Sequence, residues 1–93
     1  MKSILQDEKE CFLCGSQQML EKHHVFGGAN RRLSEKYGLT VFLCHDCHNE
    51  PPCGVHFSAV ENNKLKAIAE KRWVEINEKS KEDFIKIFGR NYI

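Results

Sequence analysis

The feature that most constrains this chain is a pair of C-x2-C motifs, "CFLCG" at residues 11–15 and "CHDC" at 44–47, with 29 residues between them. Two intervening residues let both thiolates of a pair face one ion, and two such pairs supply the four sulfur ligands of a tetrahedral structural zinc site. Gly15 suits the tight turn after the first pair. The spacing therefore predicts a zinc ion bound by Cys11, Cys14, Cys44 and Cys47.

The distribution of apolar residues explains why a structural metal ion would be needed to stabilise the fold. A chain of 93 residues makes one domain (1–93), and the apolar side chains of its first half are broken up by glycines and charged residues. Structural zinc contributes an apparent stabilisation of about 10–16 kcal/mol in small peptides, enough to fold an apolar-poor segment. Cys53 has no partner at ligand spacing and is interpreted as incidental, while His45 remains an alternative zinc ligand.

Composition limits the compartment and the partners. No apolar run is long enough for a signal peptide or a membrane span, so we expect a cytoplasmic protein with reduced thiols and no membrane partner. The net charge is +1, from 14 basic and 13 acidic residues, which excludes a polybasic tail but not a local basic surface.

The order of patterns predicts an α+β protein. Residues 1–10 are interpreted as a loose polar lead-in, and residues 11–57 as the zinc-bound module. Within that module, residues 22–26 and 40–43 are β-rich and suit an antiparallel pair joined by a long glycine-containing loop. A short helix is expected from residue 45, ending before the prolines at 51 and 52.

The remaining residues, 58–93, form a helical extension in this interpretation. "SAVE" at 58–61 and "SKED" at 80–83 are capping-box patterns, and Gly89 suits a helix C-cap. We expect helices at 59–78 and 81–88. The first should bury one apolar face, made of Leu65, Ile68, Ala69, Trp73 and Ile76.

Four histidines remain outside the cysteine set, and two of them are adjacent in "EKHHVFGG". Neighbouring strand residues point to opposite faces, so His23 and His24 cannot do the same job. His48 directly follows the last zinc cysteine, which ties it close to the strand pair. One histidine of the pair can then meet His48 around a second metal ion, while the other stays outside and accepts a proton from water.

These residues resemble a known family. The pattern "CFLCG…EKHHVFGG…VFLCHDCHN" over residues 11–57 is similar to the zinc-stapled form of the HNH, or ββα-metal, nucleases, which have a treble-clef-like fold. The longer pattern "HHVFGG…SEKYGL…LC…HN…GVHF…FGRNYI" also looks like small HNH-type proteins of phages and prophages. The resemblance implies His24 as general base, with His23 and His48 on a catalytic divalent cation (Mg²⁺, Mn²⁺, Ni²⁺ or Zn²⁺). It implies His56 as a further ligand of that cation or as a histidine that contacts phosphate. Asn49 is a candidate for orienting His48.

The sequence departs from the family pattern at one position. The family's central Asn, which braces the general base, corresponds to Leu39, and Asn30 or Thr40 are the candidate replacements. The loop over 27–36 carries Arg31, Arg32 and Lys36 against one acid. Such a loop suits the phosphate backbone of DNA, single- or double-stranded, without reading bases.

The predicted activity is therefore metal-dependent DNA hydrolysis with little sequence preference. Three alternatives stay open: a zinc module that binds nucleic acid or protein without cutting it, an accessory nuclease active only with a phage or recombination protein, and a thiol-disulfide enzyme. The oligomeric state is not predicted.

Overall fold

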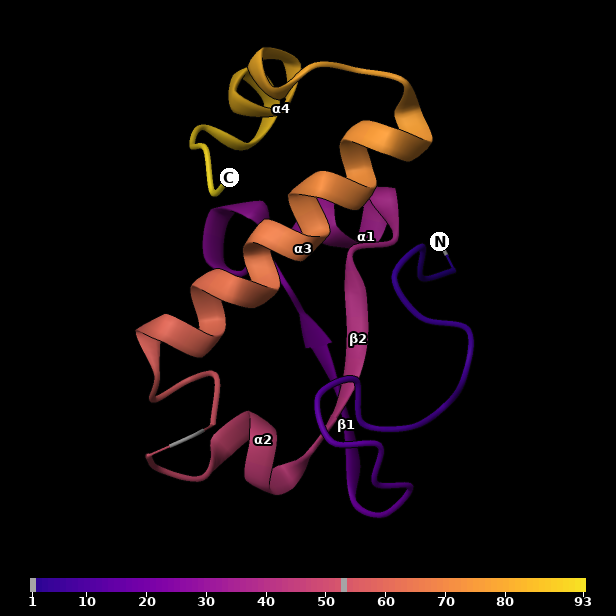
Figure 1. The fold of residues 1–93 in the computed structure, drawn as a ribbon, viewed down its shortest axis with the longest axis vertical. Helices are drawn as coiled ribbons and strands as arrows, with labels where there is room; N and C mark the ends of the chain where they lie inside the picture. The colour runs from indigo at the N-terminus through magenta and orange to yellow at the C-terminus, as the bar shows by residue number, and fades with distance from the viewer. Residues whose placement is uncertain (1, 53) are drawn as a thin grey trace.

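The computed structural model describes residues 2–52 and 54–93 and gives an α+β fold. Strands β1 (Leu20–His24) and β2 (Thr40–Cys44) form a two-stranded antiparallel sheet, in which His24 lies opposite Thr40 and Leu20 opposite Cys44. Helix α2 (His45–Asn49) follows β2 directly, as expected (Figure 1). The predicted α+β class is confirmed. The register places the end of β2, with its cysteine, beside the start of β1.

Strand β1 ends two residues before the predicted 22–26 segment does. The reason is Ser34, whose buried hydroxyl accepts from the Phe26 backbone N–H at 3.0 Å and donates to the Phe26 carbonyl at 2.8 Å. Both backbone groups of Phe26 are thus taken out of the strand pairing. The chain turns there, and the Phe26 ring enters the core.

The connection between the strands is not the long loop that we predicted. It contains a 3-10 turn, η1 (Gly28–Asn30), and helix α1 (Arg31–Tyr37). Gly38 ends α1 in the left-handed conformation, with φ of 71°, and its N–H bonds to the carbonyl of Ser34. The basic residues expected in a loop therefore lie on a helix fixed against the sheet.

The N-terminal segment is also more ordered than a loose lead-in. The Ile4 N–H donates to the Gly38 carbonyl at 2.9 Å, and the Phe42 N–H donates to the side-chain oxygen of Gln6 at 2.9 Å. The Phe12 N–H then donates to the Phe42 carbonyl at 2.8 Å. This segment runs along the outer side of β2 and protects a strand edge that would otherwise lack partners (Figure 1).

Helices α3 (Ala59–Asn77) and α4 (Lys81–Phe88) match the two predicted helices closely. Ser58 caps α3 by accepting from the Glu61 N–H, whereas Ser80 and Asp83 form a complete, reciprocal capping box at α4. Gly89 caps α4 with φ of 87°. No helix in the described residues is both long enough and apolar enough to cross a membrane.

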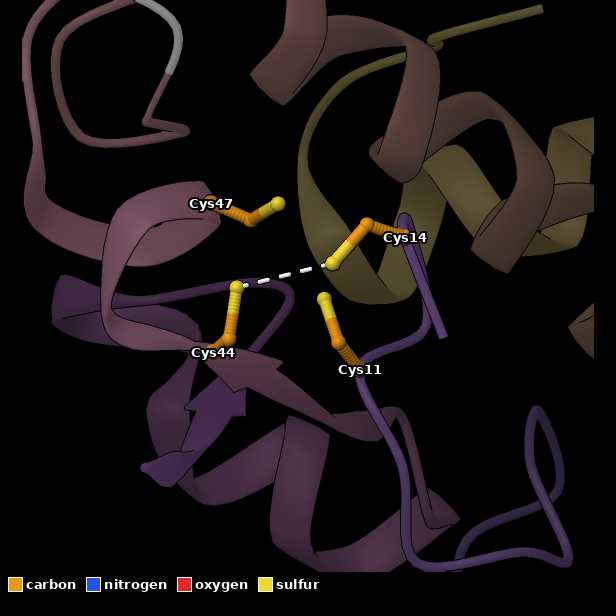
Figure 2. Close-up of side chains that lie close together, drawn as sticks. All are labelled: Cys11, Cys14, Cys44 and Cys47. Carbon is orange, nitrogen blue, oxygen red and sulfur yellow. Dashed lines mark hydrogen bonds between the residues drawn. The ribbon is translucent and has the colours of Figure 1, made fainter. Parts of the chain in front are cut away.

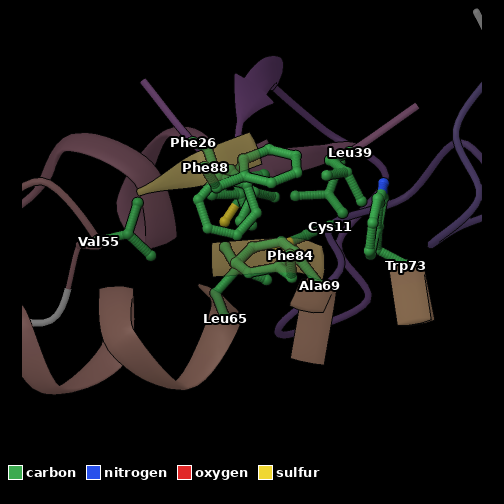
Figure 3. Packing of buried hydrophobic residues seen from close by; sticks show 13 residues of the cluster. Cys11, Phe26, Leu39, Val55, Leu65, Ala69, Trp73, Phe84 and Phe88 are labelled. Atoms are coloured by element: carbon green, nitrogen blue, oxygen red, sulfur yellow. The ribbon is translucent and has the colours of Figure 1, made fainter. Parts of the chain in front are cut away.

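The hydrophobic core lies between the sheet and the two C-terminal helices (Figure 3). The prediction for α3 is only partly right: Ile68 and Ile76 are 45% and 43% exposed, and the buried polar residue Glu70 faces inward instead. The core takes residues from both halves of the chain, among them Phe26, Leu39, Leu43 and Val55 from the first and Leu65, Ala69, Trp73, Phe84 and Phe88 from the second.

Candidate functional site

The four cysteines of the two C-x2-C motifs converge on one point (Figure 2). Cys11 and Cys14 lie in a turn closed by a 2.8 Å bond from the Gly15 N–H to the Cys11 carbonyl, with Gly15 at φ of 80°. Cys44 ends β2, and Cys47 lies on α2. All four sulfurs are within 4.8 Å of one another, so this cluster is able to hold a structural metal ion such as zinc.

The sulfur geometry tests that fit. The Sγ atoms of Cys14 and Cys44 are 3.6 Å apart. In a tetrahedron with Zn–S bonds of about 2.3 Å, neighbouring sulfurs stand about 3.8 Å apart. Burial by itself raises the pKa of the Cys11 thiol, but backbone hydrogen bonds from Cys44, Cys14 and Leu13 outweigh it and lower that pKa to about 6. Cys11 therefore favours the thiolate, the form that binds metal. Burial and the neighbouring thiols raise the pKa of Cys47 in the metal-free cluster.

Three histidines form a second cluster, on the side of the sheet where α2 packs. The Nε2 atom of His48 lies 3.2 Å from Nδ1 of His23 and 2.8 Å from Nε2 of His56. One ring nitrogen from each of the three lies within 4.8 Å of the others. Metal–nitrogen bonds of about 2.0–2.1 Å place neighbouring ligand nitrogens about 2.8–3.4 Å apart. The spacing of these imidazoles fits a shared divalent cation.

Glu21 fixes the orientation of His48. Its Oε1 lies 2.8 Å from Nδ1 of His48 and also accepts from the Asn49 side-chain amide at 2.8 Å. Because a carboxylate only accepts, the proton of His48 sits on Nδ1 and the lone pair on Nε2 faces His23 and His56. Carboxylates behind metal-binding histidines act in this way. Asn49 thus helps orient His48, as predicted, by holding Glu21.

The environment keeps two of these imidazoles neutral. Burial, together with the neighbouring His48 and His56, lowers the pKa of His23 to about 4. Burial likewise lowers the pKa of His56. A neutral imidazole offers a lone pair, so the cluster suits a metal ion better than shared protons.

His24 stands outside this cluster. His23 is buried, with 5% exposure, whereas the His24 imidazole bonds through Nε2 to Oε1 of Glu35, at 2.5 Å. Both histidines nevertheless line one open hollow of about 500 Å³, because His24 is the last residue of β1. The hollow is lined by Lys22, His23, His24, Gly27, Gly28, Arg31, Glu35, His48 and His56.

The predicted phosphate-contacting residues are only partly gathered at the hollow. Arg31 lines it and also lines an adjoining hollow, where Arg32 joins it. Both arginines are exposed, in the first turn of α1. Lys36 lines neither hollow, and its ammonium lies 5.3 Å above the ring of Tyr37.

The predicted replacements for the family Asn do not brace His24. Leu39 itself is fully buried in the core. The Asn30 amide donates to the Phe88 carbonyl at 2.9 Å, and Thr40, although opposite His24 in the sheet, makes no side-chain hydrogen bond to it in the described structure. The residue that contacts His24 is Glu35, which the sequence did not single out.

The remaining candidates are settled by position. His45 bonds to Glu50 at 2.8 Å and approaches Glu21 at 3.4 Å, so it does not replace a zinc cysteine. Cys53 lies outside the described residues. Comparisons of this chain with models of known protein families, with curated proteins and with solved structures find no match.

Proposed function

We propose that this protein is an HNH-type endonuclease that hydrolyses DNA phosphodiester bonds with a divalent cation and a histidine general base. One observation carries the proposal. Three imidazoles converge at one end of the hollow, while His24 lines the same hollow without joining them. In a module that only binds metal, a fourth histidine that lines the hollow but lies outside the three-histidine cluster would have no role. The resemblance of "EKHHVFGG" and "CHDCHN" to the HNH pattern points the same way.

In the proposed reaction, His24 accepts a proton from a water molecule while the oxygen of that water attacks phosphorus. The P–O ester bond breaks, and the products are a phosphomonoester and a free hydroxyl, which is protonated from solvent. Positioned general bases contribute about 10²–10⁴-fold. His23, His48 and His56 would hold a divalent cation, which when bound would supply positive charge opposite the scissile phosphate.

Arg31 is proposed to hold the DNA backbone beside the histidines, and Arg32 to extend that contact along α1 into the adjoining hollow. Guanidinium groups pair well with phosphate oxygens. Because such contacts do not read bases, we expect low sequence preference.

The test is nicking of supercoiled plasmid by full-length wild-type protein and by His24→Ala, each checked for zinc content and folding. Reactions contain EDTA, or added Mg²⁺, Mn²⁺ or Ni²⁺. We expect cation-dependent nicking by the wild type and a loss of about 10²–10⁴-fold in the variant, with DNA binding retained. Equal nicking by both proteins would remove His24 from the mechanism.

A matched pair of arginine variants tests the DNA contact. Arg31→Ala is expected to weaken DNA binding and to reduce its dependence on salt, because a phosphate contact is lost. Arg72→Ala, on the exposed face of α3 in an ion pair with Glu75, is expected to bind like the wild type. Binding without nicking under any cation would favour a non-catalytic module, and nicking only with a recombination protein would favour the accessory nuclease.

A further inference from the structure

We propose that Glu35 is the positioning residue for the general base: it binds the proton on Nε2 of His24 and leaves Nδ1 free to accept a proton from water. The inference rests on the proposed function for its role in catalysis. The histidine–carboxylate pair itself stands on the structure alone.

The contact determines which ring nitrogen carries the proton. Oε1 of Glu35 meets Nε2 of His24 at 2.5 Å. An ionised carboxylate has no proton to donate, so the neutral imidazole places its proton on Nε2. The lone pair is then on Nδ1. A carboxylate that fixes the tautomer of a catalytic histidine acts in the same way in Ser-His-Asp sites, where its loss leaves the wrong tautomer.

Glu35 is held in place by its neighbours in α1. Ser34, the preceding residue, is fully buried and makes two hydrogen bonds to the backbone of Phe26. The Ser34 carbonyl in turn accepts from the N–H groups of Gly38 and Leu39. Helix α1 is therefore fixed to the chain two residues beyond His24. The helix thereby fixes the backbone position from which the Glu35 side chain reaches the ring.

Glu35 also stays charged wherever a histidine base would work. Lys22 donates to the same Oε1 at 2.8 Å, and together Lys22 and His24 lower the pKa of Glu35 to about 2. An ion pair between two groups as exposed as Lys22 and Glu35 adds little to stability, so stability alone does not explain this arrangement.

The direct test reads the tautomer of His24 in full-length, zinc-loaded, ¹⁵N-labelled protein without DNA. Long-range proton–nitrogen spectra at about pH 8, where an ordinary imidazole is neutral, distinguish a protonated Nε2 from a protonated Nδ1. We expect His24 of the wild type to be protonated on Nε2 only. In Glu35→Leu a mixture of tautomers is expected. Glu75→Gln, an exposed carboxylate change on α3, should leave the signal unchanged.

Nicking assays then test the consequence. Loss of a carboxylate behind a functional histidine typically costs about 10–100-fold, and we expect Glu35→Gln and Glu35→Leu to lose activity in that range with plasmid affinity unchanged. Glu35→Asp, which restores a carboxylate, should recover part of the rate.

The possible results separate the two proposals. An unchanged His24 signal in folded Glu35→Gln and Glu35→Leu would overturn the positioning role, whatever the nicking rates. A fixed tautomer in a wild-type protein that never nicks would support the pair and overturn the nuclease. If Glu35→Leu does not fold, Glu35→Ala takes its place, because the side-chain oxygen of Gln can still accept a hydrogen bond from Nε2 of His24.

Discussion

Glu70 is a fully buried carboxylate on α3, far from either candidate metal centre in the sequence. Its Oε1 accepts from the Tyr92 N–H at 2.6 Å, while its Oε2 has no partner among the described residues. Burial raises its pKa, and the Tyr92 bond only partly opposes that shift. The folded state therefore holds this proton to higher pH than the unfolded chain does. Stability from the protonated form is lost as pH rises through the folded-state pKa.

Glu70→Gln should for that reason be more stable than the wild type at neutral pH, since it keeps the acceptor for Tyr92 without a buried charge. The difference should vanish below about pH 4.5, where Glu is protonated in both states. Urea unfolding from about pH 4 to pH 8 measures it. Both proteins are measured with excess zinc, and only at pH values where zinc analysis shows that the metal is still bound. A gap that does not change with pH would contradict this account.

Single residues differ in how well the sequence reveals them. The cysteines were predictable because two C-x2-C pairs leave few other arrangements, and His23, His48 and His56 followed from the family resemblance. Glu21 and Glu35 were not, because a carboxylate in a charged segment looks the same whether it faces solvent or a histidine. Only the pairing of β1 with β2 and the packing of α1 give them their partners.

Two glycines in the left-handed conformation end helices α1 and α4, and they offer a matched comparison at the level of the element. Gly38 has φ of 71°, and a Cβ there would lie 2.3 Å from the Lys2 carbonyl oxygen. Gly89 has φ of 87°, and a Cβ there meets nothing within 4 Å. Replacing either glycine by another residue should lower the free energy of unfolding by about 1–2 kcal/mol, because the backbone there is left-handed.

Gly38→Ala should therefore cost more than Gly89→Ala, by about 1–3 kcal/mol for the added overlap with the N-terminal segment. Chemical denaturation of the two variants beside the wild type measures both values. Equal costs would mean that the segment over residues 2–12 does not pack on Gly38 as described, and that the edge of β2 is less protected than the structure shows.

The elements themselves were predictable in proportion to their local signals. Helices α3 and α4 have capping residues in the sequence and apolar residues at helical spacing. Their bounds were predictable from these two signals. Helix α1 was missed because it is only about two turns long, in a charged segment flanked by glycines, although Gly38 was a fair stop signal. The predicted face of α3 was right at Leu65, Ala69 and Trp73 but not at Ile68 and Ile76, which are exposed. Ile76 is the residue before the last of the helix.

At the scale of the whole molecule, the part with the four-cysteine cluster and the helical part share one core. Phe26 of the first half lies with its ring centre 5.5 Å from that of Phe84 and 5.0 Å from that of Phe88 in the second. Trp73 packs against Tyr37 of α1 at 5.8 Å and against Phe84 at 5.5 Å. Because the core is small and both halves of the chain contribute to it, the protein should unfold as one cooperative unit.

Removal of zinc should consequently expose Trp73, which is 2% exposed in the folded protein and lies in the helical part of the chain. An apparent 10–16 kcal/mol, typical of structural zinc in small peptides, exceeds the stability of most small domains, so the zinc-free chain is expected to unfold throughout. Chelation should shift the Trp73 emission to the red and abolish the thermal transition, and added zinc should restore both. Cys14→Ser, which removes one exposed ligand, should need more zinc for the same recovery. A Trp73 signal that stays native after measured loss of zinc would show instead that α3 and α4 hold their core without the module, and that the domain is two units.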